Sequence, residues 1–136
     1  MAPFITSPLK YPGGKFNHLH RIFPVFPTTL NTLVSPFFGG GSIEMNLALR
    51  GTRIIGSDVN PQIVNFYNHF FDNPKRMHID ADNLVRNHYV KIKKEKYGWV
   101  HKQEYDGYAD AVLCYAYNRL SYGGKIQGHY LSLIHI

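Results

Sequence analysis

One stretch of the chain, "VSPFFGGGSIEMNLALRG" at residues 34–51, constrains the fold more than any other. The apolar, β-rich segment 31–38 predicts a first buried strand, and three glycines follow it. After the glycines we expect a helix, with Ser42 as its N-cap and Gly51 at its C′ position. Its apolar side chains recur four residues apart, in the pairs Ile43/Leu47 and Met45/Leu49.

The same alternation continues downstream. "TRIIGSD" predicts a second strand that ends at Asp58, and Asn60-Pro61 then opens another helix. That helix carries Ile63, Tyr67, Phe70 and Phe71 on one stripe. The order of strand, glycine loop, helix, strand, acid and helix predicts an α/β fold with a parallel sheet. A ligand would bind at the carboxyl ends of its strands.

The flanking segments are less regular. In "PFITSPLKYPGGK" the Pro12-Gly13 pair predicts a type II turn, and "FNHLHRIF" predicts a short helix that stops at Pro24 and Pro27. Beyond residue 74 the chain is polar, basic and mostly helical in character. "DAVLCYAYNRLSYGGK" predicts a last helix that ends at Gly123-Gly124.

Composition favours a packed domain, since 136 residues are 44% hydrophobic and 18% charged. The net charge is +6, and eight of the 15 Lys and Arg residues lie between Lys75 and Lys102. Such a segment suits binding to phosphates, but a solvated helix face explains it equally well.

Several classes of protein are disfavoured. Cys114 is the only cysteine, so disulfides and cysteine-based metal sites are excluded, and its apolar surroundings predict burial. The eight histidines show no spacing typical of metal ligands, and we expect no metal. We expect a cytoplasmic protein, because neither a signal peptide nor a run long enough to cross a membrane is visible.

Three ligands could occupy the glycine loop. A Walker loop is excluded because Ser42-Ile43, and not Lys-Ser or Lys-Thr, follows the glycines. A dinucleotide fingerprint would place Glu44 where a third glycine belongs, and its charge would repel a pyrophosphate. S-adenosylmethionine fits best, because Asp58 could accept hydrogen bonds from a ribose and the methionine end is zwitterionic.

Four segments together resemble the Dam-type DNA adenine N6-methyltransferases of bacteria and phages. They are "LKYPGGK", "PFFGGGSIEMNL", "SDVNPQIVNFYN" and "YNRLSYGGK", in this order. The resemblance runs from about Pro8 to Tyr130. It implies a Rossmann-like S-adenosylmethionine-dependent methyltransferase fold, incomplete here, with a mainly helical DNA-recognition insert.

The resemblance also implies roles for individual residues. Those expected to bind S-adenosylmethionine are Tyr11, Lys15, Pro36, Phe37, Gly39, Gly40, Gly41 and Asp58. Those expected to meet double-stranded DNA are Asn118, Arg119, Tyr122, Gly124 and Lys125. Asn118 alternatively belongs to an ordinary helix end, and the same holds for its neighbours.

The chain departs from the family pattern at two places. Family members commonly carry Glu before the Pro-Phe of the glycine loop, where this chain has Ser35. The catalytic Asp-Pro-Pro-Tyr tetrad does not occur in the 136 residues, since none of the 8 prolines is adjacent to another. "LSLIHI" at 131–136 resembles a translated transposase adaptor, so we expect an adaptor-derived tail on a truncated gene fragment.

These patterns predict three parts: the cofactor half of a catalytic domain at 1–73, a truncated helical insert at 74–130, and the tail. The expected function is site-specific adenine methylation of DNA by a monomer in a bacterial or phage-infected cell, with the fragment itself inactive. Two other classes stay open: a nucleotide-dependent oxidoreductase with a degenerate glycine loop, and a non-catalytic DNA-binding protein.

Overall fold

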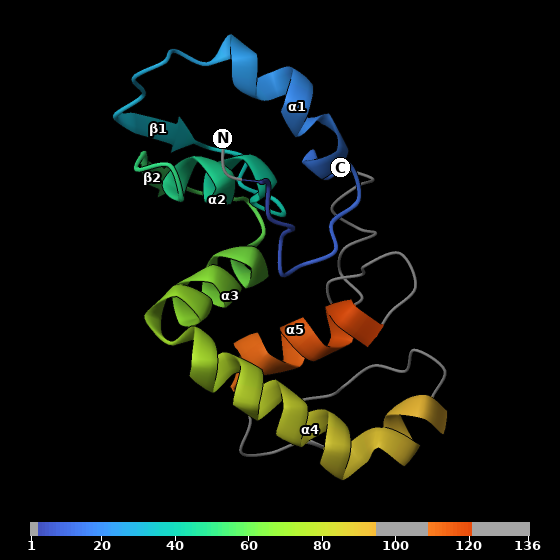
Figure 1. The fold of residues 1–136 in the computed structure, drawn as a ribbon. Helices are drawn as coiled ribbons and strands as arrows, with labels where there is room; N and C mark the ends of the chain where they lie inside the picture. Colours follow the sequence, from blue (N-terminus) through green and yellow to red (C-terminus); the bar gives the residue numbers. More distant parts are fainter. Residues whose placement is uncertain (1–2, 95–108, 121–136) are drawn as a thin grey trace. The chain divides into compact units, whose positions relative to one another are not determined.

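The computed structural model describes residues 3–94 and 109–120 of the chain. Its residues form two compact units, Met1–Asn60 and Pro61–Ile136, and each is described by itself. The first unit holds the sheet and the second holds helices (Figure 1).

The sheet of the first unit consists of β1 (Thr32–Ser35) and β2 (Arg53–Gly56), which pair in parallel. Helix α2 (Ser42–Ala48) connects them and packs against β2 (Figure 1). In the register, Leu33 pairs with Ile54 and Val34 with Ile55. The predicted order of strand, glycine loop, helix and strand is therefore confirmed.

The prediction that the first strand is buried is wrong. Leu33 and its partner Ile54 are half-buried, whereas Val34 is 66% exposed and Ile55 48% exposed. Successive side chains of a strand point to opposite faces, so these two pairs lie on different faces of the sheet. Within the described residues the sheet has only two strands. The face that carries Val34 and Ile55 remains exposed to solvent.

Helix α2 also differs from its prediction. Its N-cap is Gly41, in the left-handed conformation with φ 71°, and Ser42 is its first helical residue. Glycine adopts this conformation without the cost that a side chain adds, so the turn ends at Gly41 and the helix starts one residue earlier than predicted. Of the expected apolar stripe, Leu47 is buried but Leu49 is 63% exposed.

Polar residues of α2 are buried instead, and Asn46 is fully buried. Its side-chain amide donates to the carbonyl oxygen of Ile5 and to that of Ser42, at 2.9 and 2.8 Å. Its side-chain oxygen accepts the N–H of Ile5 at 2.9 Å. One amide thus satisfies both backbone groups of Ile5 and fixes the N-terminal segment to α2.

The segment before the sheet forms three short turns of helix: η1 (Phe16–His18), α1 (Leu19–Ile22) and η2 (Phe23–Val25). The predicted short helix is thus confirmed in place, with 3-10 turns at both ends. The Arg50 guanidinium lies 4.9 Å from the ring centre of Phe4 and 5.0 Å from that of Phe23. These cation–π contacts join the N-terminal segment, η2 and the end of α2.

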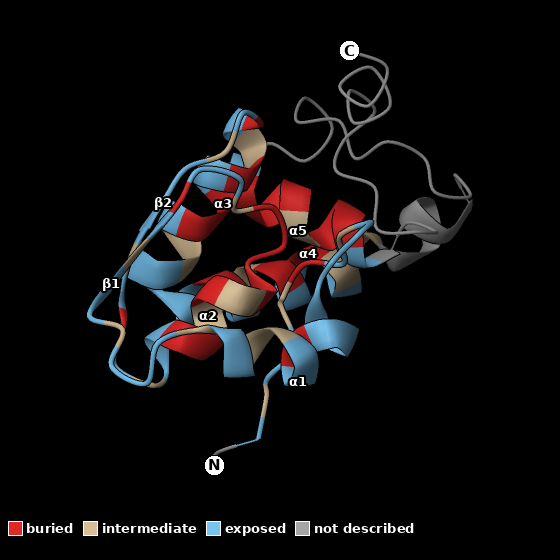
Figure 2. Ribbon diagram, turned by 90° about the horizontal axis from the view of Figure 1, so that it is seen from above, coloured by how far each residue is buried: buried red, intermediate tan, exposed pale blue. Residues whose placement is uncertain are grey.

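The second unit is built from α3 (Pro61–Asp72), α4 (Pro74–Lys94) and α5 (Asp110–Leu120), which all contact one another. Figure 2 shows that α5 is buried along much of its length. Each helix contributes apolar residues at helical spacing: Ile63, Phe66 and Tyr67; Met77, Ala81 and Leu84; Ala111 to Cys114, Ala116 and Tyr117. On the stripe predicted for α3, Ile63 and Tyr67 are buried but Phe71 is 57% exposed.

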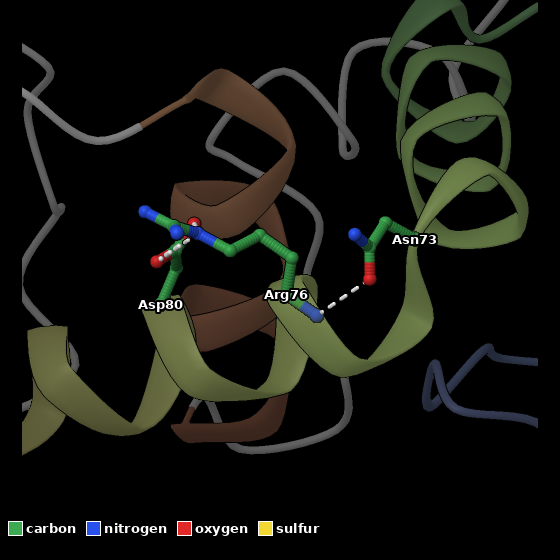
Figure 3. A network of polar contacts seen from close by, with 3 residues as sticks. All are labelled: Asn73, Arg76 and Asp80. Atoms are coloured by element: carbon green, nitrogen blue, oxygen red, sulfur yellow. Dashed lines mark hydrogen bonds and ion pairs between the residues drawn. The ribbon is translucent and has the colours of Figure 1, made fainter.

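The junction between α3 and α4 lies at Asn73, which ends the part predicted at residues 1–73. The Asn73 side-chain oxygen accepts the N–H of Arg76 at 3.0 Å, and the Arg76 side chain pairs with Asp80 one turn later (Figure 3). Asn73 therefore caps α4, and Pro74 occupies its first position. The helical character predicted beyond residue 74 is confirmed for α4 and α5.

We expect Asn46→Ala to release the N-terminal segment. The substitution leaves the N–H and C=O of Ile5 without their buried partner, at a cost of about 2 kcal/mol. Hydrogen exchange should show faster exchange of the Ile5 amide and of its neighbours. The control is Asn65→Ala on the exposed face of α3, which should leave that exchange unchanged. Equal exchange in both variants would contradict this role of Asn46.

Candidate functional site

A cleft of about 120 Å³ lies between two segments of the first unit. One wall is Tyr11 with the turn at Gly13 to Lys15, and the other runs from Phe37 to Glu44. The first wall precedes the sheet, and the second is the loop between β1 and α2. Two motifs that lie apart in the sequence thus form one site.

The contact between the walls requires glycine. A Cβ atom on Gly40 would lie 2.9 Å from the Cβ of Tyr11, closer than real Cβ atoms approach. A Cβ on Gly39 would lie 3.1 Å from the Tyr11 ring, and Gly39 also has a φ of 53°. The hydroxyl of Ser7 donates to the carbonyl oxygen of Gly40 and joins the N-terminal segment to the glycine loop. The glycines therefore allow Tyr11 to lie directly against the loop.

The first wall is shaped by the predicted turn. The Gly14 N–H donates to the carbonyl oxygen of Tyr11 at 3.0 Å, and Gly13 has a φ of 75°. A positive φ at this position is what a type II turn needs. Lys15 follows the turn, is exposed, and lines the cleft.

Asp58 fixes the glycine loop to the end of β2. Its Oδ2 accepts the N–H of Gly39 at 2.8 Å, and its Oδ1 accepts the N–H of Asn60 at 2.9 Å. The Phe38 N–H also donates to the carbonyl oxygen of Ser57, at 3.0 Å. A carboxylate has about four lone-pair sites, so these two bonds leave Asp58 able to accept more.

The structure brings most of the residues predicted to bind the cofactor to this cleft. Six line it: Tyr11, Lys15, Phe37, Gly39, Gly40 and Gly41. Asp58 joins it through Gly39, and Pro36 is exposed outside the lining. Their binding of a cofactor stays a prediction.

Glu44 is a lining residue to which the sequence assigned no binding role. It is 7% exposed, and its Oε1 accepts the hydroxyl of Ser35 at 2.5 Å. Burial raises the pKa of Glu44, and the Ser35 hydroxyl and a backbone hydrogen bond partly offset the rise. The sequence feature that could have indicated a binding role for Glu44 is its charge in the first turn of a helix that follows a glycine loop.

The residues predicted to meet DNA are only partly described. Asn118 is buried within α5, and Arg119 is exposed at the end of the same helix. Tyr122, Gly124 and Lys125 lie outside the described residues, as does the predicted turn at Gly123-Gly124.

On α4, part of the basic charge is neutralised by acids one turn away. Arg76 pairs with Asp80 at 3.0 Å and Arg86 with Asp82 at 2.8 Å. Such exposed pairs stabilise a helix by only tenths of a kcal/mol.

Other kinds of site find no support in the described residues. No group of three His, Cys, Asp or Glu side chains in residues 3–94 and 109–120 is placed to hold a metal ion. Cys114 is buried, as predicted. Burial raises the pKa of its thiol to about 12, so the thiol is not a nucleophile at neutral pH. None of the described helices is long and apolar enough to cross a membrane.

Comparison with known proteins identifies the family. The family model for D12 class N6 adenine-specific DNA methyltransferases matches residues 11–128. The chain belongs to this family. Both walls of the cleft lie within the matched residues, so the site is part of the shared domain.

Individual relatives agree with this assignment. Over 71 residues the chain is 37% identical to modification methylase StsI of Streptococcus sanguinis, covering 52% of this chain and 11% of that protein. It is 38% identical over 60 residues to a DNA adenine methylase of Haemophilus influenzae, covering 44% and 20%. Over 103 residues it is 31% identical to type II methyltransferase M1.LlaDCHI of Lactococcus lactis, covering 76% and 34%. The chain thus matches between a tenth and a third of the length of these relatives.

We expect Glu44→Gln to stabilise the protein more at neutral than at acidic pH. The folded pKa of Glu44 lies above its ordinary value of 4.5, so both states are protonated below that value. As the pH rises above 4.5, the unfolded carboxyl ionises while the folded one keeps its proton, so stability falls until the folded pKa is passed, and glutamine avoids this loss. Urea unfolding of both proteins between pH 4 and 8 should show the difference growing with pH.

Ser35→Ala is the matched control. It removes a donor that lowers the pKa of Glu44, so in the Ser35→Ala protein the effect of Glu44→Gln should begin at the same pH, extend to higher pH and become larger. A stability difference that does not change with pH would contradict the burial of a charge at Glu44.

Proposed function

We propose that the whole protein transfers a methyl group from S-adenosylmethionine to the N6 amine of adenine in double-stranded DNA. We also propose that this chain carries the cofactor half of that enzyme. The observation that supports the proposal most is the cleft, because Tyr11 and Lys15 meet the glycine loop there. Both belong to motifs that the family resemblance assigns to the cofactor.

The sheet supports the same proposal. Its β1–α2–β2 unit would be the start of a Rossmann-like methyltransferase sheet, and the cleft lies after the carboxyl end of β1. In parallel α/β sheets this end of the strands is where ligands bind. Asp58, two residues after β2, would accept hydrogen bonds from the ribose with its remaining lone pairs.

We assign DNA contact to residues 74–130, the predicted insert, with residues 1–73 as the cofactor part. The basic residues between Lys75 and Lys102 would attract phosphates without regard to sequence, so binding should weaken with salt. Arg119 is exposed and would be one such contact, whereas Asn118 is buried and would act by shaping α5. Tyr122, Gly124 and Lys125 complete the proposed DNA-binding set, and the enzyme would act as a cytoplasmic monomer.

The chemistry follows from the target. An adenine inside a duplex is out of reach, so it must be turned out of the stack at a cost of a few kcal/mol. S-adenosylmethionine supplies an activated methyl group, and catalysis then consists mostly of holding the amine in line with it. The Gly39–Gly41 loop, Tyr11 and Lys15 would orient the donor. The Asp-Pro-Pro-Tyr tetrad, which would contact the target base, does not occur in the 136 residues. We therefore expect no methyl transfer by this chain alone.

Calorimetry tests the cofactor assignment. The chain should bind S-adenosylhomocysteine in preference to NAD, and Asp58→Ala should abolish that binding because the ribose loses its acceptor. The control is Asp72→Ala at the exposed end of α3, which should bind as the unaltered chain does. Circular dichroism checks that both variants fold.

The opposite outcomes are equally clear. Preference for NAD would favour an oxidoreductase, and DNA binding on which the cofactor has no effect would favour a non-catalytic DNA-binding protein. Transfer of radiolabelled methyl groups to DNA by these 136 residues would contradict the expected inactivity.

A further inference from the structure

Glu44 is a buried charge at the edge of the cleft for which the proposed function has no use so far. It lines the cleft and is 7% exposed. Its described partners are the Ser35 hydroxyl and a backbone group, and no Lys, Arg or His of the described residues forms an ion pair with it. Burying a carboxylate without a cation is costly, and its hydrogen bond with Ser35 would form equally well with glutamine.

The cleft also contains one positive side chain. Among its lining residues, Lys15 carries the one amine side chain and Glu44 the one carboxyl side chain. No ion pair joins them in the described part of the chain. The remaining lining residues are glycines, aromatic residues, Ser42 and Ile43. The cleft thus offers one cation and one anion, separately, on an otherwise uncharged surface.

We propose that Glu44 is the residue that recognises the ammonium group of the donor's α-amino-acid end, while Lys15 binds its carboxylate. The inference rests on the proposed function and names a contact within the same site. A zwitterion matches the two opposite charges, and an ammonium would supply the cation that Glu44 lacks.

Other ligand ends match the cleft less well. A pyrophosphate carries only negative charge and would be repelled by Glu44. A neutral or apolar group would leave the buried carboxylate without compensation. An ammonium donates hydrogen bonds and favours the ionised carboxylate, and charge-assisted bonds of this kind are about twice as strong as neutral ones.

The same contact bears on the departure at Ser35. Ser35 ends β1, and the carboxylate that lies against it comes from Glu44 on α2. The Ser35 hydroxyl and the Glu44 carboxylate are 2.5 Å apart. The two residues could therefore exchange identities and keep a carboxylate at the same place.

Two ligands separate this contact from the rest of the site. S-adenosylhomocysteine has the amino-acid end, and 5′-methylthioadenosine has the nucleoside and sulfur without it. For the chain of 136 residues, Glu44→Gln should weaken S-adenosylhomocysteine binding by roughly tenfold to a hundredfold, because a charge-assisted bond is lost. Binding of 5′-methylthioadenosine should stay within about twofold. Both affinities are measured by calorimetry at pH 8.

The exchanged variant, Ser35→Glu with Glu44→Ser, is the rescue. It should recover at least part of the preference for S-adenosylhomocysteine, which a variant that merely perturbs the fold would not do. Unchanged S-adenosylhomocysteine affinity in Glu44→Gln would overturn the inference and leave the proposed function intact. Equal weakening of both ligands would also overturn it. If the unaltered chain bound neither ligand, the proposed function would fail, and the inference with it.

Discussion

The direct contact between Tyr11 and the backbone of Gly39 and Gly40 is the constraint on which the site depends. Any side chain at Gly40 would collide with Tyr11, so the loop between β1 and α2 requires glycine at this position. This approach creates the cleft, because it brings the turn at Gly13 to Lys15 beside the loop. The surrounding hydrogen bonds hold both partners: Asp58 fixes the loop to β2, and Ser7 binds the loop from the N-terminal segment.

Helix α2 supports this arrangement with polar side chains. Asn46 fixes the N-terminal segment through both backbone groups of Ile5, and Glu44 bonds Ser35 at the end of β1. A helix that packed by apolar contacts alone would not specify the position of an irregular segment so narrowly, because hydrogen bonds are directional. The cost is a buried carboxyl whose pKa is raised by burial. We interpret this cost as a sign of function, since perturbed groups gather in binding sites.

The two compact units are stabilised by different means. In the first, glycine conformations, an amide and a carboxylate fix the backbone around a cleft. In the second, apolar and aromatic side chains form the core, as where the rings of Phe66 and Tyr115 stack at 5.7 Å. Polar contacts around irregular backbone suit a site that holds a small ligand, and an apolar core suits a scaffold.

Patterns in the amino-acid sequence predicted the order of elements, the turn at Gly13 and, through the resemblance, the family. These follow from local rules, since periodicity, proline and glycine act over a few residues. The sequence did not predict that Val34 and Leu49 are exposed, that Gly41 caps α2, or that Asn46 and Glu44 are buried, because these depend on the folded arrangement. Burial depends on which segments meet, and Ile5 lies 41 residues from Asn46. For the same reason the sequence predicted six of the twelve residues that line the cleft but missed Glu44, whose partner Ser35 becomes its neighbour only when β1 and α2 fold together.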